Sequence, residues 1–267
     1  MSMGHASTAK FIEKRPGRQT LARGRTYIYA IIPEAPGRTF DDVGIDGLPV
    51  YAISAGRVSA AVSDLPGEKV RPERARLAAH QGVLKKLMAE VTPLPMSFGT
   101  LADSPEAVRR MLSRNQPALL AQLRRVADKV EMGLRVAWDV PSIFEYFVDI
   151  HTELRLARDR FLAGPREPTQ EQKIEVGRMF DRLLNADRDA YAAKVEEILS
   201  PHCAEIVRNK CRTECEVMNL VCLVKRSALT QFEGGVFEAA EQFDNNFVFD
   251  FNGPWAPHNF VDAGVEL

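Results

Sequence analysis

The chain has 267 residues, of which 45% are hydrophobic and 27% are charged, and its formal net charge is −1. This composition is typical of a folded globular protein and excludes a disordered or collagen-like chain. The charge balance gives no overall basic footprint for nucleic acid or an anionic membrane, so neither is expected as a partner. Without the apolar segment of a secretory signal, we expect a cytoplasmic protein with reduced cysteines.

The two ends of the chain carry opposite charge. Residues 1–25 hold six basic residues and one acid without hydrophobic periodicity, which predicts a flexible basic tail. The 36 residues from Phe232 onward hold seven acids and no Lys or Arg. This asymmetry fits attraction between copies, folding of the tail onto the chain's own C-terminal region, or two solvated surfaces.

Residues 26–128 are predicted to form an N-terminal α+β domain. Aromatic and β-branched residues predict a strand at 26–32, and a hairpin follows at 51–62. Pro72 opens a helix that ends near Glu90 and has one apolar face. That face carries Leu77, His80, Leu84, Leu87 and Val91.

Prolines determine the rest of this domain. Pro93 and Pro95 prevent a helix, so Leu94–Phe98 is predicted to be an extended segment at a sheet edge. Two helices are expected next, over residues 104–114 and 117–127, because a proline begins each of them.

Residues 129–252 are predicted to form the second domain. A strand at 130–138 precedes a long helix, whose apolar residues repeat at spacings of four and three from Ile143 to Phe161. Thr169 and Gln172 fit a capping box that starts a helix to Ser200, so the two helices form an antiparallel hairpin.

The remaining elements complete a recognisable order. We expect strands at 204–207 and 217–224, a helix at 229–243 and a strand at 246–251. Read from Val130, this is the split βαββαβ order, which gives a four-stranded antiparallel sheet with helices on one face. The fold class is therefore α+β with two domains.

Aromatic residues gather near the C-terminus. Residues 253–267 are too rich in proline at their start for a sheet ladder, which predicts an extended C-terminal tail with Trp255 and Phe260 as anchors. Stacking of RNA on these aromatics is the alternative reading, but that chemistry needs basic neighbours, and this region has none.

No motif predicts catalysis. The chain lacks phosphate-binding, dinucleotide-binding, nucleophile-elbow and zinc-protease signatures. His80 is interpreted as a hydrogen-bonded core histidine, since no nucleophile accompanies it. Cys211 and Cys215 lack the second ligand pair of a zinc site. We therefore expect no enzyme, no catalytic residue, no cofactor and no metal.

Seven motifs in order resemble those of the gas vesicle protein F/L family (GvpF/GvpL). The N-terminal half supplies a Tyr-x-Tyr strand, a hairpin strand, a helix with histidine before Val-Leu and a Leu-Pro-x-x-Phe-Gly-Thr segment. They are Tyr27–Tyr29, Gly56–Ser63, His80–Leu84 and Leu94–Thr100. The C-terminal half supplies Glu131–Asp139, Met218–Lys225 and Gly253–Phe260. The chain departs from the family pattern at Ser97, Ala256 and His258.

The resemblance implies a non-enzymatic role in building gas vesicles and a second domain that is a modified ferredoxin-like unit. Its implied partners are the small hydrophobic major shell protein, GvpA, and other accessory proteins. The resemblance also implies that the chain can remain in the vesicle wall as a minor component. An unassembled shell subunit exposes more apolar surface than a soluble monomer tolerates, so it needs cover. We expect this chain to bind it and keep it from aggregating.

Three surfaces are candidates for docking of the shell protein. They are the edge segment, the groove between the domains and the aromatic end. The predicted partner-binding residues are Leu94, Pro95, Phe98, Trp255 and Phe260. The competing interpretation is a small-molecule-binding regulator or enzyme on a ferredoxin-like fold, with His80 or the Cys211/Cys215 pair in a pocket.

Overall fold

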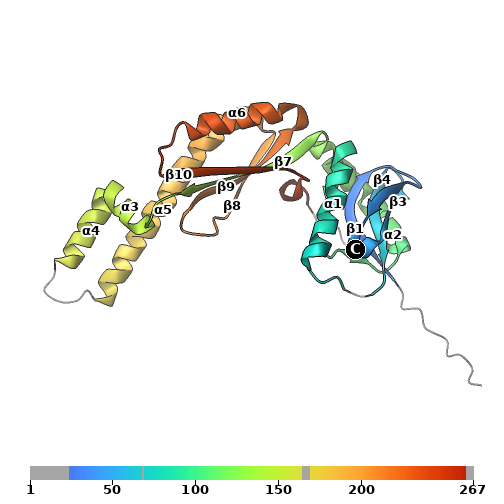
Figure 1. The fold of residues 1–267 in the computed structure, drawn as a ribbon, viewed down its shortest axis with the longest axis horizontal. Coiled ribbons are helices and arrows are strands. Elements are labelled where there is room, and N and C mark those ends of the chain that lie inside the picture. Colours follow the sequence, from blue (N-terminus) through green and yellow to red (C-terminus); the bar gives the residue numbers. More distant parts are fainter. Residues whose placement is uncertain (1–23, 68, 164–168, 263–267) are drawn as a thin grey trace, which may run out of the picture.

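The structure is a computed structural model that describes residues 24–67, 69–163 and 169–262. Figure 1 shows an elongated molecule with an N-terminal lobe at one end, a second sheet in the middle and a pair of helices projecting from the other end. Each of the two sheets is antiparallel. None of the helices in these ranges combines the length and apolar character that a bilayer crossing needs.

The N-terminal lobe is one sheet with a helix on each face. Its strands are β1 (Arg25–Pro33), β2 (Thr39–Val43), β3 (Pro49–Ala55), β4 (Val58–Leu65), β5 (Leu94–Pro95) and β6 (Leu101–Ala102), and its helices are α1 (Arg74–Glu90) and α2 (Pro105–Val126). The order is β2-β3-β4-β1-β5, with β6 also pairing β1. A short 3-10 turn, η1 (Ile45–Gly47), joins β2 to β3.

The alternation of β1 explains how two helices share one sheet. Tyr27 and Tyr29 lie in the same core cluster as Leu84 of α1, whereas Ile28 lies in a separate cluster with Leu112 of α2. Because successive side chains of a strand point to opposite faces, α1 and α2 cover opposite sides of β1.

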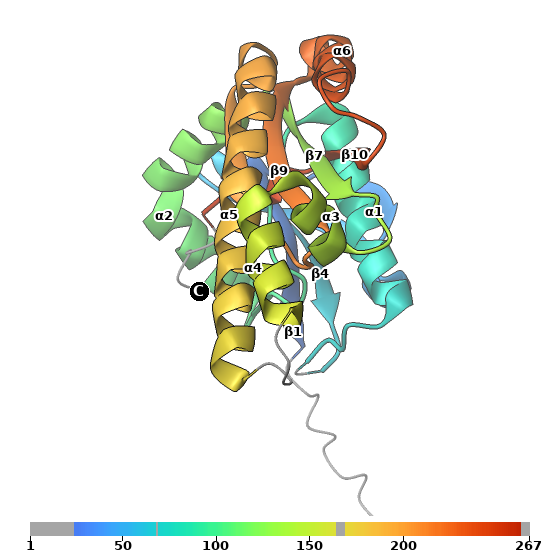
Figure 2. The same ribbon diagram turned by 90° about the vertical axis from the view of Figure 1, so that its left-hand side faces the viewer.

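The second lobe is a four-stranded sheet with helices on one face. The strands are β7 (Lys129–Trp138), β8 (Glu205–Asn209), β9 (Glu216–Lys225) and β10 (Phe247–Trp255), in the order β10-β7-β9-β8. The helices are α3 (Ile143–Ile150), α4 (Thr152–Leu162), α5 (Gln170–Leu199) and α6 (Leu229–Ala240), and the 3-10 turns are η2 (Ser200–His202), η3 (Arg226–Ala228) and η4 (His258–Phe260). Figure 2 shows α4 standing beside the lower part of the longer α5, and the predicted capping box is present at Thr169 and Gln172.

The predicted single helix over 143–161 is wrong, because it is broken at His151. The backbone of His151 leaves the helical region (φ −109°, ψ 106°), and α3 ends where α4 begins. Its ring stacks on Phe147 at 5.2 Å between centroids, and its Nε2 lies 3.0 Å from a carboxylate oxygen of Asp187 on α5. A contact with a distant helix therefore sets the break.

Two further expectations need correction. The helices predicted at 104–114 and 117–127 are one helix, α2, with Pro117 inside it. The segment after Phe251 was predicted to leave the sheet, yet β10 continues through the irregularity between Asn252 and Trp255, where Trp255 pairs with Glu131. The bulge removes the proline from the ladder, so no hydrogen bond is lost to its missing N–H.

The predicted apolar face of α1 is correct except at its start. His80, Leu84 and Leu87 are buried, whereas Leu77 is 40% exposed because it lies in the first turn, beyond the edge of the sheet contact. The strand at 39–43 was not predicted, since its sequence Thr-Phe-Asp-Asp-Val has little strand character.

Candidate functional site

Three of the sequence motifs meet beneath α1 in one buried cluster. The Tyr27 hydroxyl lies 2.8 Å from Nδ1 of His80 and accepts a hydrogen bond from the Gly99 N–H at 3.2 Å. The Phe98 ring lies edge-on to His80 at 5.8 Å between centroids. His80 is 2% exposed, and its burial, followed by the nearby His258, lowers its pKa to about 4. The imidazole is therefore neutral at pH 7.

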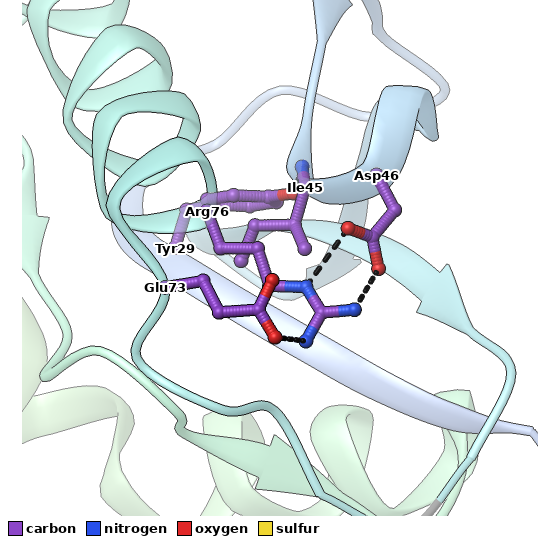
Figure 3. A network of polar contacts seen from close by, with 5 residues as sticks. All are labelled: Tyr29, Ile45, Asp46, Glu73 and Arg76. Atoms are coloured by element: carbon purple, nitrogen blue, oxygen red, sulfur yellow. Dashed lines mark hydrogen bonds and ion pairs between the residues drawn. The ribbon is translucent and has the colours of Figure 1, made fainter.

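Tyr29 continues this cluster toward the surface. Its hydroxyl accepts a hydrogen bond from the Ile45 N–H at 2.9 Å, as Figure 3 shows. Next to it, the Arg76 guanidinium of α1 donates to both carboxylate oxygens of Asp46, at 2.9 and 3.0 Å, and contacts Glu73. These bonds tie the start of α1 to η1 and to β1.

The cluster positions α1 and has no geometry for catalysis. Burial raises the pKa of Tyr27 to about 12 and also raises the pKa of Tyr29, so both phenols stay neutral. The side chains that meet His80 are aromatic rings and a neutral phenol, with no nucleophile among the contacts described. We therefore assign a structural role to His80, in agreement with its interpretation from the sequence.

The C-terminal segment after β10 is fixed against the second sheet. Glu131 on β7 accepts hydrogen bonds from the N–H and the side-chain amide of Asn259, at 2.8 and 2.7 Å. The Trp255 indole donates to Asn252 at 2.8 Å. Gly253 has φ +131°, and a Cβ there would approach the Met132 sulfur to 2.7 Å, so only glycine fits this turn.

Phe260 connects this segment to both lobes. It is 2% exposed and lies in the core cluster that contains Leu119 and Leu123 of α2 together with Val221 and Leu223 of β9. Two polar contacts reinforce this connection. The Gln122 side chain forms hydrogen bonds with the backbone of Asp262, and Arg125 donates to the Glu205 carboxylate from two guanidinium nitrogens, Nε and Nη2.

A groove of about 390 Å³ separates α1 from this C-terminal segment. One wall comes from α1, the other from the end of β10 and Ala256 after it, and Arg226 also lines the groove. The lining residues are Gln81, Gly82, Leu84, Lys85, Met88, Ala89, Arg226, Gly253, Pro254, Trp255 and Ala256. Apolar side chains and Trp255 form most of the lining, with Lys85 and Arg226 as its cations. We call this surface the α1 groove.

The structure separates the five predicted partner-binding residues. Leu94 and Pro95 are at the predicted sheet edge but are buried, and Phe98 is half-buried over His80. Phe260 is buried in the core, as described above. Trp255 is 47% exposed and lines the α1 groove. Of the three predicted docking surfaces, the groove between the lobes and the aromatic end thus meet at Trp255.

Sequence reasoning missed the α1 side of the groove. Leu84 and Met88 were not proposed as binding residues, since their helical spacing indicates only a core face. One signal was available: Gly82 lies inside a helix, where glycine costs about 1 kcal/mol relative to alanine. A Cβ on Gly82 would meet open space, so the glycine keeps this part of the groove wide.

The cysteines show no metal geometry. Cys211 is half-buried, with its thiol directed at the Val217 carbonyl at 3.6 Å, and Cys215 is exposed. Within residues 24–67, 69–163 and 169–262, no group of three or more His, Cys, Asp or Glu side chains is arranged to hold a metal ion.

The fold defines a mixed α+β protein with two antiparallel sheets, and the α1 groove lies between its two lobes. The chain belongs to the gas vesicle synthesis protein GvpL/GvpF family, whose model matches residues 25–262. It therefore has a role in gas vesicle formation.

Curated relatives and a solved structure agree with this assignment. Gas vesicle protein F of a Streptomyces species is 29% identical over 245 residues, covering 89% of this chain and 99% of the relative. Gas vesicle protein F of Dolichospermum flosaquae is 25% identical, covering 88% and 96%. The crystal structure of GvpF from Anabaena sp. PCC7120 matches with a TM-score of 0.78 at 23% identity, covering 91% of this chain and all of that one. These relatives are named as gas vesicle proteins and not as enzymes.

Proposed function

We propose that this chain is a gas vesicle accessory protein that binds the major shell protein, GvpA, in the α1 groove and keeps it from aggregating before assembly. The observation that carries the proposal is the half-exposed Trp255 on an apolar groove in a member of this family. Large aromatic side chains that remain exposed at a concave surface are typical anchors of protein interfaces.

The chemistry of the groove fits an apolar helix or strand better than a charged ligand. Leu84 and Met88 line its base although both are almost fully buried, and the half-exposed Trp255 supplies the accessible apolar surface. A shell subunit outside the wall exposes more than the few hundred Å² of apolar surface that a soluble monomer tolerates. A groove of about 390 Å³ accepts a few side chains of such a subunit, enough to mask one patch.

The five predicted residues take two roles in this proposal. Trp255 contacts the shell protein directly. Phe260 and the edge segment Leu94–Phe98 position the two walls, since Phe260, Leu94 and Pro95 are buried. In this proposal the groove lies between two domains whose boundary is near residue 129, and the second domain is ferredoxin-like. The chain binds newly made shell protein in the cytoplasm. Other gas vesicle accessory proteins are further partners.

The test is co-expression of this chain with GvpA, followed by pull-down and measurement of the soluble fraction of GvpA. Gly82→Phe places a ring in the groove, and we expect it to abolish co-purification and lower soluble GvpA. The matched control is Gly177→Phe on α5, where an added Cβ also meets open space on an exposed helix. This control should retain binding.

Two results would contradict the proposal. If native chain neither retains GvpA nor raises its soluble fraction, direct binding is wrong. If Gly82→Phe and Trp255→Ala bind GvpA as well as the native chain does, the shell protein docks elsewhere. Circular dichroism of each variant shows that a loss of binding is not a loss of fold.

A further inference from the structure

The outer surface of α6, which lies beside strand β10, is acidic and carries an exposed aromatic ring. Glu233, Phe237 and Glu241 follow one another at intervals of four residues, which places them on one face of the helix. Phe237 is 64% exposed, and its ring lies edge-on to Phe251 of β10 at 6.4 Å. We call this surface the acidic edge; its exposed members are Glu233, Phe237, Glu238, Glu241 and Asp244.

The charges of the acidic edge are unbalanced. Among the residues that the structure describes, its four carboxylates form no ion pair, and the last turn of α6 holds no basic residue. Glu238 and Glu241 lie at the C-terminal end of α6, where the helix dipole disfavours negative charge. Lys194 of α5 lies nearby and donates to the Gln242 carbonyl at 3.2 Å. A cationic partner would stabilise this surface.

The backbone of β10 offers a second means of attachment. β10 is an edge strand of its sheet, and in the described part of the chain it pairs with β7 alone. An edge strand presents unpaired N–H and C=O groups to which an extended segment can add. The acidic edge therefore fits an extended, basic segment with at least one apolar residue for Phe237.

The chain contains such a segment in residues 1–23. It holds five basic residues and one acid, with an apolar pair, Phe11-Ile12, between Lys10 and Lys14. The family model matches residues 25–262, so this segment lies outside the part that the family shares. We propose that residues 1–23 bind the acidic edge of the same chain.

Reach and concentration favour the chain's own segment as the occupant. Twenty-three extended residues span roughly 75 Å. A tether that spans the two sites gives an effective concentration on the order of 1 mM. A segment with a Kd of about 100 μM would then occupy the site about 90% of the time.

The test uses a fluorescent synthetic peptide of residues 1–23 and full-length protein at about 50 mM salt. The neutral-segment variant replaces Lys10, Lys14, Arg15, Arg18 and Arg23 by glutamine. We expect the peptide to bind this variant about tenfold more tightly than the native chain, whose own segment competes. Because screening weakens exposed charge pairs, the affinity should fall strongly at 0.5 M salt.

Surface variants locate the site. In the neutral-segment background, Glu233→Lys with Glu241→Lys, or Phe237→Ser alone, should weaken peptide binding at least fivefold. The matched control is Glu171→Lys with Glu175→Lys, two exposed carboxylates on α5, which should leave binding unchanged. Circular dichroism confirms the fold of each variant.

Three results would overturn the proposal. The first is no peptide binding to the neutral-segment variant. The second is equal affinity for the native and neutral-segment chains, which would show that the native segment does not occupy the site. The third is self-association of the native chain, lost in the neutral-segment variant on ultracentrifugation, which would assign the occupant to a second copy.

Discussion

The carboxylate of Glu131 and the side chain of Asn259 are hydrogen-bonded at 2.7 Å although 128 residues separate them in the sequence. The Asn259 N–H donates to the other oxygen of the same carboxylate at 2.8 Å. Burial raises the pKa of Glu131, and the two hydrogen bonds from Asn259 oppose that rise. The pair joins the first strand of the second sheet to the segment that carries Trp255, so it holds one wall of the α1 groove in place.

We expect Asn259→Ala to destabilise the protein by about 1.5–3 kcal/mol, because it removes a hydrogen bond to a buried charged group and leaves the backbone bond intact. The loss should raise the pKa of Glu131 further. The folded variant then binds a proton more readily than the native protein does, so the destabilisation is largest at neutral pH and shrinks as the pH falls.

Urea unfolding at pH 7 and pH 5 measures this effect. Asn245→Ala, an exposed asparagine in the loop before β10, is the control and should change stability by less than about 0.5 kcal/mol. An equal loss at both pH values would show that the carboxylate charge is not involved.

Trp255 and Phe260 should separate binding from stability. Phe260 is buried among side chains of both lobes, so Phe260→Ala should cost about 3–5 kcal/mol of unfolding free energy. Trp255 is half exposed and donates one surface hydrogen bond, so Trp255→Ala should cost about 1 kcal/mol or less and act mainly on GvpA binding. Thermal unfolding of the two variants, with GvpA pull-down, checks this order. The reverse order of stabilities would contradict the assigned roles.

Local sequence signals predicted most elements because each rests on nearby residues. The strand at 26–32, the capping box at Thr169 and the edge position of Leu94 and Pro95 follow from side-chain pattern and proline chemistry, and all are confirmed. The predicted ferredoxin-like description of the second domain and the domain boundary near 129 remain proposals.

The errors arose where a distant contact decides the local structure. The break at His151 depends on Asp187 of α5, which no periodicity within 143–161 reveals. The groove was anticipated only as a space between domains. Its α1 side consists of Leu84 and Met88, whose spacing is the same for a core face and for a groove floor. The path of the C-terminal segment, which Glu131 and Asn259 fix, places a second wall opposite them and so forms the groove.

His80 should make stability depend on pH. Its pKa is about 4 in the folded protein, lowered first by burial and then by His258, against about 6.5 when unfolded. The unfolded chain therefore binds the proton more readily, so the contribution of His80 is fully present above pH 6.5 and is lost as the pH falls toward 4. The loss amounts to roughly 3 kcal/mol at 1.4 kcal/mol per pKa unit.

The substitution His80→Gln keeps a side chain that can form a hydrogen bond with the Tyr27 hydroxyl. Unlike histidine, glutamine does not titrate. We expect this variant to be less stable than the native protein at pH 7 and to lose less stability between pH 7 and pH 4.5. Chemical unfolding across this range checks the slope, with His202→Gln at the half-buried 3-10 turn η2 as the control. Parallel slopes for native protein and His80→Gln would mean that His80 does not titrate in this window.

Pro117 in the middle of α2 gives the last prediction. A proline inside a helix removes one hydrogen bond and costs about 3 kcal/mol. The helix nevertheless continues, because Leu112 and Leu119 on either side of Pro117 are buried in one core cluster. Burying each leucine contributes roughly 1.5–3 kcal/mol, which offsets the cost.

Pro117 itself is exposed, so its replacement opens no cavity. We expect Pro117→Ala to stabilise the protein by about 2 kcal/mol, after allowance for the greater freedom of the unfolded chain. Pro105→Ala is the matched control in the same helix: proline is favourable in the first turn, so this change should be neutral or slightly destabilising. If Pro117→Ala lowers the unfolding midpoint in urea, Pro117 stabilises the helix. The explanation that core packing keeps α2 helical despite the cost of Pro117 would then be wrong.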